Sequence, residues 1–148
     1  MILLEKKGVI TPDMDKTNIA FSFDVPDGVS ALNMDFSYSP KTLDDESAAV
    51  RLISSALEQY LGTDHGKDPR DFLPVKNLIT VSVDDPLGYR GAAHRQPNEQ
   101  HIVIGRAETS PGFTKGAVSS GTWRVVLNVH CCVCDAAYNL KISGGTVQ

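Results

Sequence analysis

The densest group of side chains able to do chemistry is the segment His130-Cys131-Cys132-Val133-Cys134. On a strand, Cys132 and Cys134 would share a face, and His130 could add a third ligand for zinc. A structural zinc site normally needs four ligands, often from two separated pairs, and the sequence holds no second pair of cysteines. We therefore favour reduced, partly buried thiols at the end of a strand. A metal site built from His130, Cys132 and Cys134 is the alternative.

Two other uses of these thiols are disfavoured. The sequence has 3 cysteines, an odd number, and no secretory signal accompanies them, which argues against a disulfide framework. A redox-sensing thiol needs a neighbouring positive charge to lower its pKa, and the segment shows no cationic neighbour.

Acidic residues gather at two turns. Asp24 and Asp27 flank a turn that contains proline, and Asp84-Asp85 precedes Pro86. Sandwich proteins can bind Ca²⁺ through such carboxylates and loop carbonyls, because Ca²⁺ takes about six to eight oxygen ligands. The sequence contains no Asp-x-Asp-x-Asp loop, so we favour ordinary solvated turn residues.

Arg90 lies within Gly88-Tyr89-Arg90-Gly91, where the glycines permit another backbone to approach closely. We favour a structural role, in which the fork of guanidinium donors ties loop carbonyls together. The alternative is a contact with an anion or a partner, for which Arg90, Tyr89 and Trp123 are the candidate binding residues. Trp123 is the only tryptophan, and such a residue is more often a core anchor than a ligand platform.

Strands must position these residues, because polar and apolar side chains alternate along much of the chain. Residues 18–25 and 29–38 alternate on either side of an Asp27-Gly28 turn signal. In residues 121–129 one face is wholly apolar, and it includes Trp123. Further strands are indicated at residues 3–10, 77–84, 101–104 and 137–143. The pattern predicts an all-β fold, an antiparallel β-sandwich of jelly-roll type with about eight strands.

One inserted helix is predicted near residues 43–61. Thr42 and Asp45 have the spacing of a helix-capping pair, and the following acidic residues suit the positive end of a helix. Gly62 gives a stop signal. We expect this helix to cap an open end or edge of the sandwich, with its apolar stripe in the core. The stripe consists of Ala49, Ile53, Ala56, Leu57, Tyr60 and Leu61.

The segments 86–91, 102–104, 107–116 and 121–127 follow one another in an order and spacing that resemble a known family. They are similar to the amino-terminal β-sandwich region that precedes the metal-dependent PHP domain in CehA/McbA-like metallohydrolases. Residues 25–40 resemble the early strands of that region. Ala92-Ala93-His94 differ from the tryptophan and small residues that the family often has there. The resemblance implies a β-sandwich module without its catalytic domain.

A Thr-Asp-His tripeptide occurs in PHP metallohydrolases, where it follows a buried strand. Here Thr63-Asp64-His65 follows the predicted helix, and the His-x-His cluster that would complete such a metal site is missing. The remaining histidines, His94, His101 and His130, are isolated in the sequence. We interpret the tripeptide as part of a loop and predict no catalytic residue.

The composition limits the classes of protein to which this chain can belong. A chain of 148 residues is long enough for one domain with a real core, spanning residues 1–148. The net charge of −4 and the lack of a Lys/Arg run disfavour nucleic acid and anionic membranes as partners. The start of the chain does not have the pattern of a signal peptide, and no stretch is long and apolar enough to span a bilayer. We therefore expect a cytoplasmic protein.

These observations predict a non-catalytic accessory or binding module without a cofactor. Its partner would be a protein, a glycan or a metallohydrolase domain. The alternative is a metal-dependent, phosphoesterase-like hydrolase, or a small metal-binding protein that uses His130, Cys132 and Cys134. An exposed aromatic groove would favour a glycan, whereas a flat apolar patch would favour a protein partner.

Overall fold

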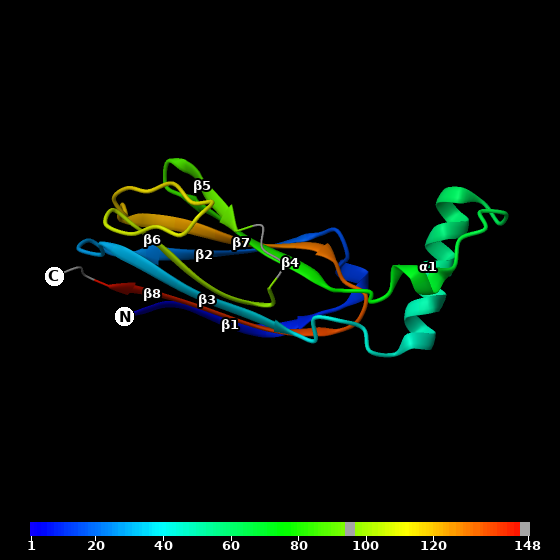
Figure 1. Ribbon diagram of the computed structural model, residues 1–148. Helices are drawn as coiled ribbons and strands as arrows, with labels where there is room; N and C mark the ends of the chain where they lie inside the picture. Colours follow the sequence, from blue (N-terminus) through cyan, green and yellow to red (C-terminus); the bar gives the residue numbers. More distant parts are fainter. Residues whose placement is uncertain (94–96, 146–148) are drawn as a thin grey trace.

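The computed structural model describes residues 1–93 and 97–145, which form two stacked antiparallel sheets (Figure 1). The strand order is β1-β8-β3-β6 in the first sheet and β2-β7-β4-β5 in the second. The sheets do not close into a barrel, so the predicted β-sandwich is confirmed. The strands are β1 (Ile2–Ile10), β2 (Asn18–Val25), β3 (Ala31–Ser39), β4 (Leu78–Asp85), β5 (Gly88–Ala93), β6 (Glu99–Gly105), β7 (Gly121–Cys131) and β8 (Ala136–Gly145).

The core lies between the two sheets and follows the predicted alternation. On β7, at the centre of the second sheet, Trp123, Val125 and Leu127 are fully buried. The register pairs Trp123 with Phe23 of β2, and their ring centroids lie 6.4 Å apart. Full burial of an apolar side chain such as Val125 or Leu127 stabilises the fold by about 1.5–3 kcal/mol.

Two edges of the sandwich carry a cation that lies over an aromatic ring. On one side, β1 and β2 are neighbouring edge strands, and Lys6 Nζ lies 5.6 Å from the ring centroid of Phe21. On β5, the opposite edge of the second sheet, the Arg90 guanidinium lies 5.5 Å from the ring centroid of Trp123. An inward charge such as Lys6 also discourages an edge strand from pairing with another chain.

A single α-helix occurs among the described residues, and it does not cap the sandwich as predicted. Figure 1 shows α1 (Glu46–Leu61) beyond the end of the sandwich, away from both termini. It packs against the short 3-10 helix η2 (Pro69–Phe72). Only Ala49 and Leu57 of its apolar stripe are buried, and Ala56, Tyr60 and Leu61 are exposed. In the part of the chain that the structure describes, no helix is long and apolar enough to cross a membrane.

The helix starts three residues later than predicted because the preceding residues pair with the segment that returns from η2. Leu43 N donates to Val75 O, and Thr42 bridges to Lys76. Asp45 then caps the helix, since its carboxylate accepts from Ala48 N at 3.1 Å. The two paired segments form a neck that joins the insert to the sandwich.

Asn77 fixes this neck to the sandwich. Its side chain is fully buried, and its Nδ2 donates to Pro40 O at 2.9 Å. Its Oδ1 accepts from Val133 N at 2.8 Å, in the turn between β7 and β8. One amide therefore holds three separate segments together, and every polar atom of the amide has a partner, as burial requires.

The β6–β7 loop (residues 106–120) runs along the outer edge of β5. Gly112 O accepts from Ala92 N at 3.1 Å, and Thr114 N donates to Arg90 O at 2.8 Å. Phe113 bridges to Gly91, and its side chain is buried. Because Gly91 has no Cβ, the loop backbone can lie directly against the strand.

We predict that Gly91→Ala destabilises the fold far more than Gly88→Ala. Both residues have positive φ, 137° and 134°, so alanine strains the backbone at either position. A Cβ at Gly91 would also overlap Gly112 O and lie 2.5 Å from Phe113 Cα, whereas nothing lies within 4 Å of a Cβ at Gly88. We expect losses of about 3 kcal/mol or more and about 1 kcal/mol in urea unfolding. Equal losses would contradict the close docking of the loop.

Candidate functional site

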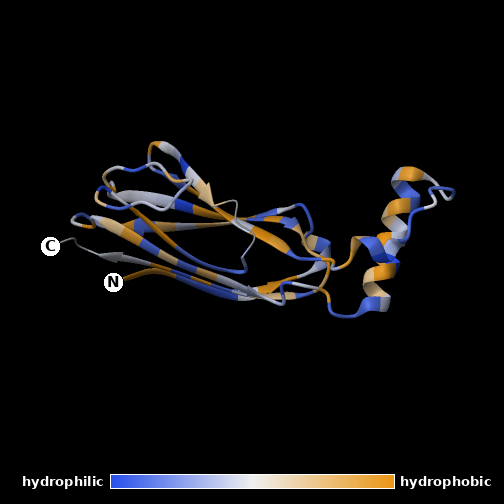
Figure 2. Ribbon diagram, in the orientation of Figure 1, coloured by the Kyte–Doolittle hydropathy of each residue, from blue (hydrophilic) through white to orange (hydrophobic). Residues whose placement is uncertain are grey.

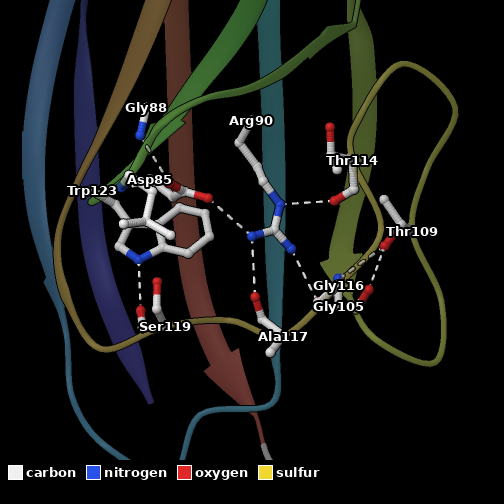
Figure 3. Close-up of polar contacts among 11 residues, drawn as sticks. Asp85, Gly88, Arg90, Gly105, Thr109, Thr114, Gly116, Ala117, Ser119 and Trp123 are labelled. Carbon is white, nitrogen blue, oxygen red and sulfur yellow. Dashed lines mark hydrogen bonds and ion pairs between the residues drawn. The ribbon is translucent and has the colours of Figure 1, made fainter.

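A dense group of polar contacts lies around Arg90, at the end of the sandwich where β1 begins and β8 ends (Figures 1 and 3). The Arg90 side chain is only 8% exposed. Its Nε donates to Thr114 O at 2.7 Å, its Nη2 to Gly116 O at 3.0 Å and its Nη1 to Ala117 O at 3.1 Å. The guanidinium thus ties down three carbonyls of the β6–β7 loop, as the structural interpretation of Arg90 predicts.

Asp85 supplies the countercharge and also builds the β4–β5 turn. Its Oδ2 accepts from Arg90 Nη1 at 3.1 Å, and both side chains are largely buried. Its Oδ1 accepts from Leu87 N at 2.7 Å and Gly88 N at 3.1 Å. One carboxylate therefore joins the turn to the guanidinium, and through it to the loop. Close, buried, charge-assisted hydrogen bonds of this kind are among the stronger ones in proteins.

The three candidate binding residues have different surroundings. Trp123 is fully buried, and its Nε1 donates to Ser119 O at 2.8 Å. The Arg90 donors point into the fold, to loop carbonyls and to Asp85. Of the three, Tyr89 alone faces solvent, and the residue is 70% exposed.

Sequence reasoning missed Leu87, the most exposed large apolar residue of the described chain, at 93%. It follows Pro86 and precedes Gly88, in the turn between two strands. Pro86 and Gly88 are typical turn residues, and turns usually lie at the surface, so the sequence did carry a signal that Leu87 is exposed. Leu87 and Tyr89 together form an apolar tip on the β4–β5 turn.

The structure does not bring His130, Cys132 and Cys134 together as ligands. His130 is exposed on β7, with Nε2 2.8 Å from Thr80 Oγ1 of β4. The strand ends at Cys131, so Cys132 and Cys134 lie in the turn between β7 and β8 and not on a shared strand face. Cys132 turns inward instead, and its Sγ lies 3.2 Å from Cys134 O. Asp15 fixes this turn, because its carboxylate accepts from Cys132 N at 2.7 Å.

The other candidate metal ligands also lie apart from one another. Within residues 1–93 and 97–145, no three His, Cys, Asp or Glu side chains form a group that could hold a metal ion. His65 lies in the loop after α1, where its Nδ1 accepts from Lys67 N at 2.9 Å. Asp24 accepts from the Thr122 hydroxyl at 2.9 Å. His94 lies outside the described residues.

The local environment keeps two of the thiols protonated. Burial, followed by the charges of Cys134 and Asp15, raises the pKa of Cys132 from 9.0 to about 11. Burial and Asp15 also raise the pKa of Cys131, although Lys16 and Lys41 act in the opposite direction. These two lysines are cationic neighbours that the sequence did not indicate. Neutral thiols are poor nucleophiles and poor metal ligands, so these two cysteines suit a structural role.

The outer face of the first sheet contains a hollow of about 540 Å³. Across it the register aligns Glu5, Lys141, Asp35 and His101, with alternating sign when His101 is protonated. His101 Nδ1 lies 2.6 Å from Asp35 Oδ1. Among the described residues that line the hollow, Phe36 is the only Phe, Tyr or Trp, and its side chain is buried in the core. The described lining therefore offers no exposed Phe, Tyr or Trp ring on which a sugar could stack.

Comparison of the chain with models of known protein families finds no match, and comparison with curated proteins finds no significantly similar sequence. The resemblance to the CehA/McbA-like sandwich region therefore depends on the quoted sequence segments.

We predict that Arg90→Met lowers the free energy of unfolding by about 3–5 kcal/mol, because it leaves the Asp85 carboxylate buried without its countercharge. Arg90→Lys would recover only part of this loss, since one ammonium cannot reach all four acceptors. Arg124→Met, on the exposed outer face of β7, is the matched control and would change stability by less than about 1 kcal/mol. Urea unfolding measures all three. A small effect of Arg90→Met would show that the β6–β7 loop is held by other contacts.

The raised pKa of Cys132 predicts a pH dependence of stability. Above pH 9.0 the thiol ionises in the unfolded chain, while the buried thiol stays protonated until about pH 11. Stability is therefore lost as pH rises from about 9 to 11, by roughly 2 kcal/mol from this group. Unfolding measured across this range would show a shallower decline for Cys132→Ala than for the natural chain, because the other titrating groups cancel in the comparison. Parallel declines would place the Cys132 thiol in a solvated environment.

Proposed function

We propose that this chain is a non-catalytic accessory module that docks on a protein partner through the β4–β5 turn. The observation that carries the proposal is the apolar tip formed by Leu87 and Tyr89, which are 93% and 70% exposed. Exposed large apolar side chains gathered at one place are typical of interaction sites. Tyrosine in particular is enriched among residues that dominate binding energy.

The tip is held rigid before any partner arrives. Asp85 closes the turn through two backbone amides and is itself held by Arg90. Arg90 is in turn fixed by the β6–β7 loop. A rigid tip loses little conformational entropy on binding, so more of the contact energy is available as affinity. The polar network thus supports binding without touching the partner.

The position of the tip suits a domain of the same polypeptide or of a close partner. The β4–β5 turn, the start of β1 and the end of β8 lie at one end of the sandwich (Figure 1). A domain placed next to the start of β1 or the end of β8 would lie at the same end of the sandwich as this turn. The CehA/McbA-like resemblance supports a metallohydrolase domain of the PHP type as the docking partner.

Two other ligand classes fit less well. A glycan would need exposed aromatic rings along a groove, and the hollow on the first sheet is lined mainly by charged and polar residues. Nucleic acid would need a basic surface, and the chain carries 14 Lys and Arg against 18 Asp and Glu. The cytoplasmic location expected from the sequence stays a prediction.

We predict that Leu87→Gln/Tyr89→Gln weakens binding to an isolated PHP-type catalytic domain at least tenfold, because the apolar contact is lost. Isothermal titration calorimetry against that domain measures the affinity. Tyr60→Gln is the matched control, since Tyr60 is 73% exposed at the far end of the molecule. It would bind like the natural chain.

Two results would count against the proposal. If the double variant binds as strongly as the natural chain, the tip is not part of the interface. If the natural chain does not bind, a PHP-type catalytic domain is not its partner. Hydrolysis of phosphodiester substrates by the chain alone, above a heat-denatured control, would contradict the non-catalytic assignment.

A further inference from the structure

Helix α1 has little support from the rest of the molecule. Only 2 of its 16 residues, Ala49 and Leu57, are buried. The ion pair between Glu46 and Arg70 of η2 spans 3.6 Å, but both side chains are 66% exposed, so it contributes little. A helix of this length is marginal in water unless an apolar face is packed. The structure therefore presents a helix that lacks a packing partner on one side.

The unpacked side carries a regular apolar row. Leu52, Ala56 and Tyr60 follow one another at intervals of four residues, which places them along one face of the helix. Leu52 is 45% exposed and Tyr60 is 73% exposed. The polar residues beside the row, Ser55 and Gln59, are uncharged. Figure 2 shows apolar residues along α1 outside the sandwich.

The rest of the described chain covers this row only in part: Ala49, one turn before Leu52, is buried, whereas exposure rises from Leu52 to Tyr60. The helix lies at the end of the sandwich opposite both termini (Figure 1). A membrane surface is a poor occupant, because acidic residues, Asp44, Asp45 and Glu46, precede and open the helix, and anionic lipids attract basic segments. An apolar row with uncharged flanks instead fits another helix of similar character.

We propose that α1 pairs with α1 of a second copy of this chain, in antiparallel orientation about a two-fold axis at Ala56. An antiparallel pair centred on Ala56 places Leu52 of each protomer against Tyr60 of the partner subunit. The small Ala56 side chain at the axis lets the two backbones approach. A two-fold interface requires a surface that is complementary to itself, and this row satisfies that requirement. The antiparallel arrangement also aligns the two helix dipoles favourably.

The size of the contact sets the strength of the dimer. The helix is about 24 Å long at the usual rise per residue. Two such rows with their flanks would bury on the order of 1,000 Å², the lower limit for a specific interface. The dimer is accordingly weak and forms in a concentration-dependent equilibrium.

The first test is cross-linking at the axis. Only a residue at a two-fold axis meets its own copy, so Ala56→Cys would form a disulfide between protomers. Glutathione disulfide is the oxidant: the two thiols lose two electrons and two protons, and the oxidant is reduced to two glutathione molecules. Arg51→Cys, on the opposite side of the helix, and the natural chain with its 3 cysteines are the controls. The proposal is overturned if Ala56→Cys yields no more dimer than these controls.

The second test is sedimentation equilibrium over a dilution series from the highest soluble concentration. The natural chain is expected to dimerise, and Leu52→Gln/Tyr60→Gln to weaken association at least tenfold. Glutamine keeps helix propensity high, and circular dichroism confirms folding. Tyr89→Gln is the matched control and would associate like the natural chain, which separates this interface from the proposed docking tip. A natural chain that is monomeric throughout, or a double variant that dimerises normally, overturns the proposal.

Discussion

The buried guanidinium of Arg90 is the interaction on which one end of this sandwich depends. Burying a charge costs several kcal/mol unless partners replace its water. Asp85 and the carbonyls of Thr114, Gly116 and Ala117 are those partners. The β6–β7 loop depends on Arg90 in turn. The same carbonyls belong to this loop, which has 15 residues without regular structure and is long for a compact domain. The strand, the turn and the loop are consequently stable only as a set.

At the other end of the sandwich, the neutral side chain of Asn77 also joins separate segments through buried hydrogen bonds. Its amide satisfies Pro40, Val133 and Cys134 at the point where the insert leaves the sandwich. Lys41 adds a second tie, since its Nζ donates to Asn77 O at 2.8 Å and to the Tyr38 hydroxyl at 2.9 Å. The neck is therefore firmly attached, while the helix beyond it has few contacts of its own. The two ends of the molecule therefore differ. The turn and loop around Arg90 are fixed by contacts with the sandwich, whereas α1 has few such contacts.

The sequence predicted what depends on local pattern and missed what depends on distant contacts. The alternation in residues 18–25 and 121–129 identified both strands and the inward side of Trp123, because side-chain direction in a strand has a period of two. The extent of α1 was close, but its covered face depends on η2, which apolar spacing does not encode. The different environments of Tyr89 and Arg90 were also hidden. A register shift falls at this point, because Val83 pairs with Gly91 and Asp84 with Tyr89, which leaves Arg90 as the extra, bulged residue of β5.

The two exposed tyrosines show that binding depends on how firmly the fold holds a side chain as well as on how exposed that side chain is. Tyr89 and Tyr60 have nearly equal exposed fractions, 70% and 73%. Tyr89 stands on a turn fixed by a buried ion pair, so a partner gains the contact without ordering the chain. Tyr60 stands on a helix with two buried residues, so a contact there also supplies packing that the helix lacks. Association at α1 is therefore coupled to the stability of the insert, whereas docking at the β4–β5 turn is not.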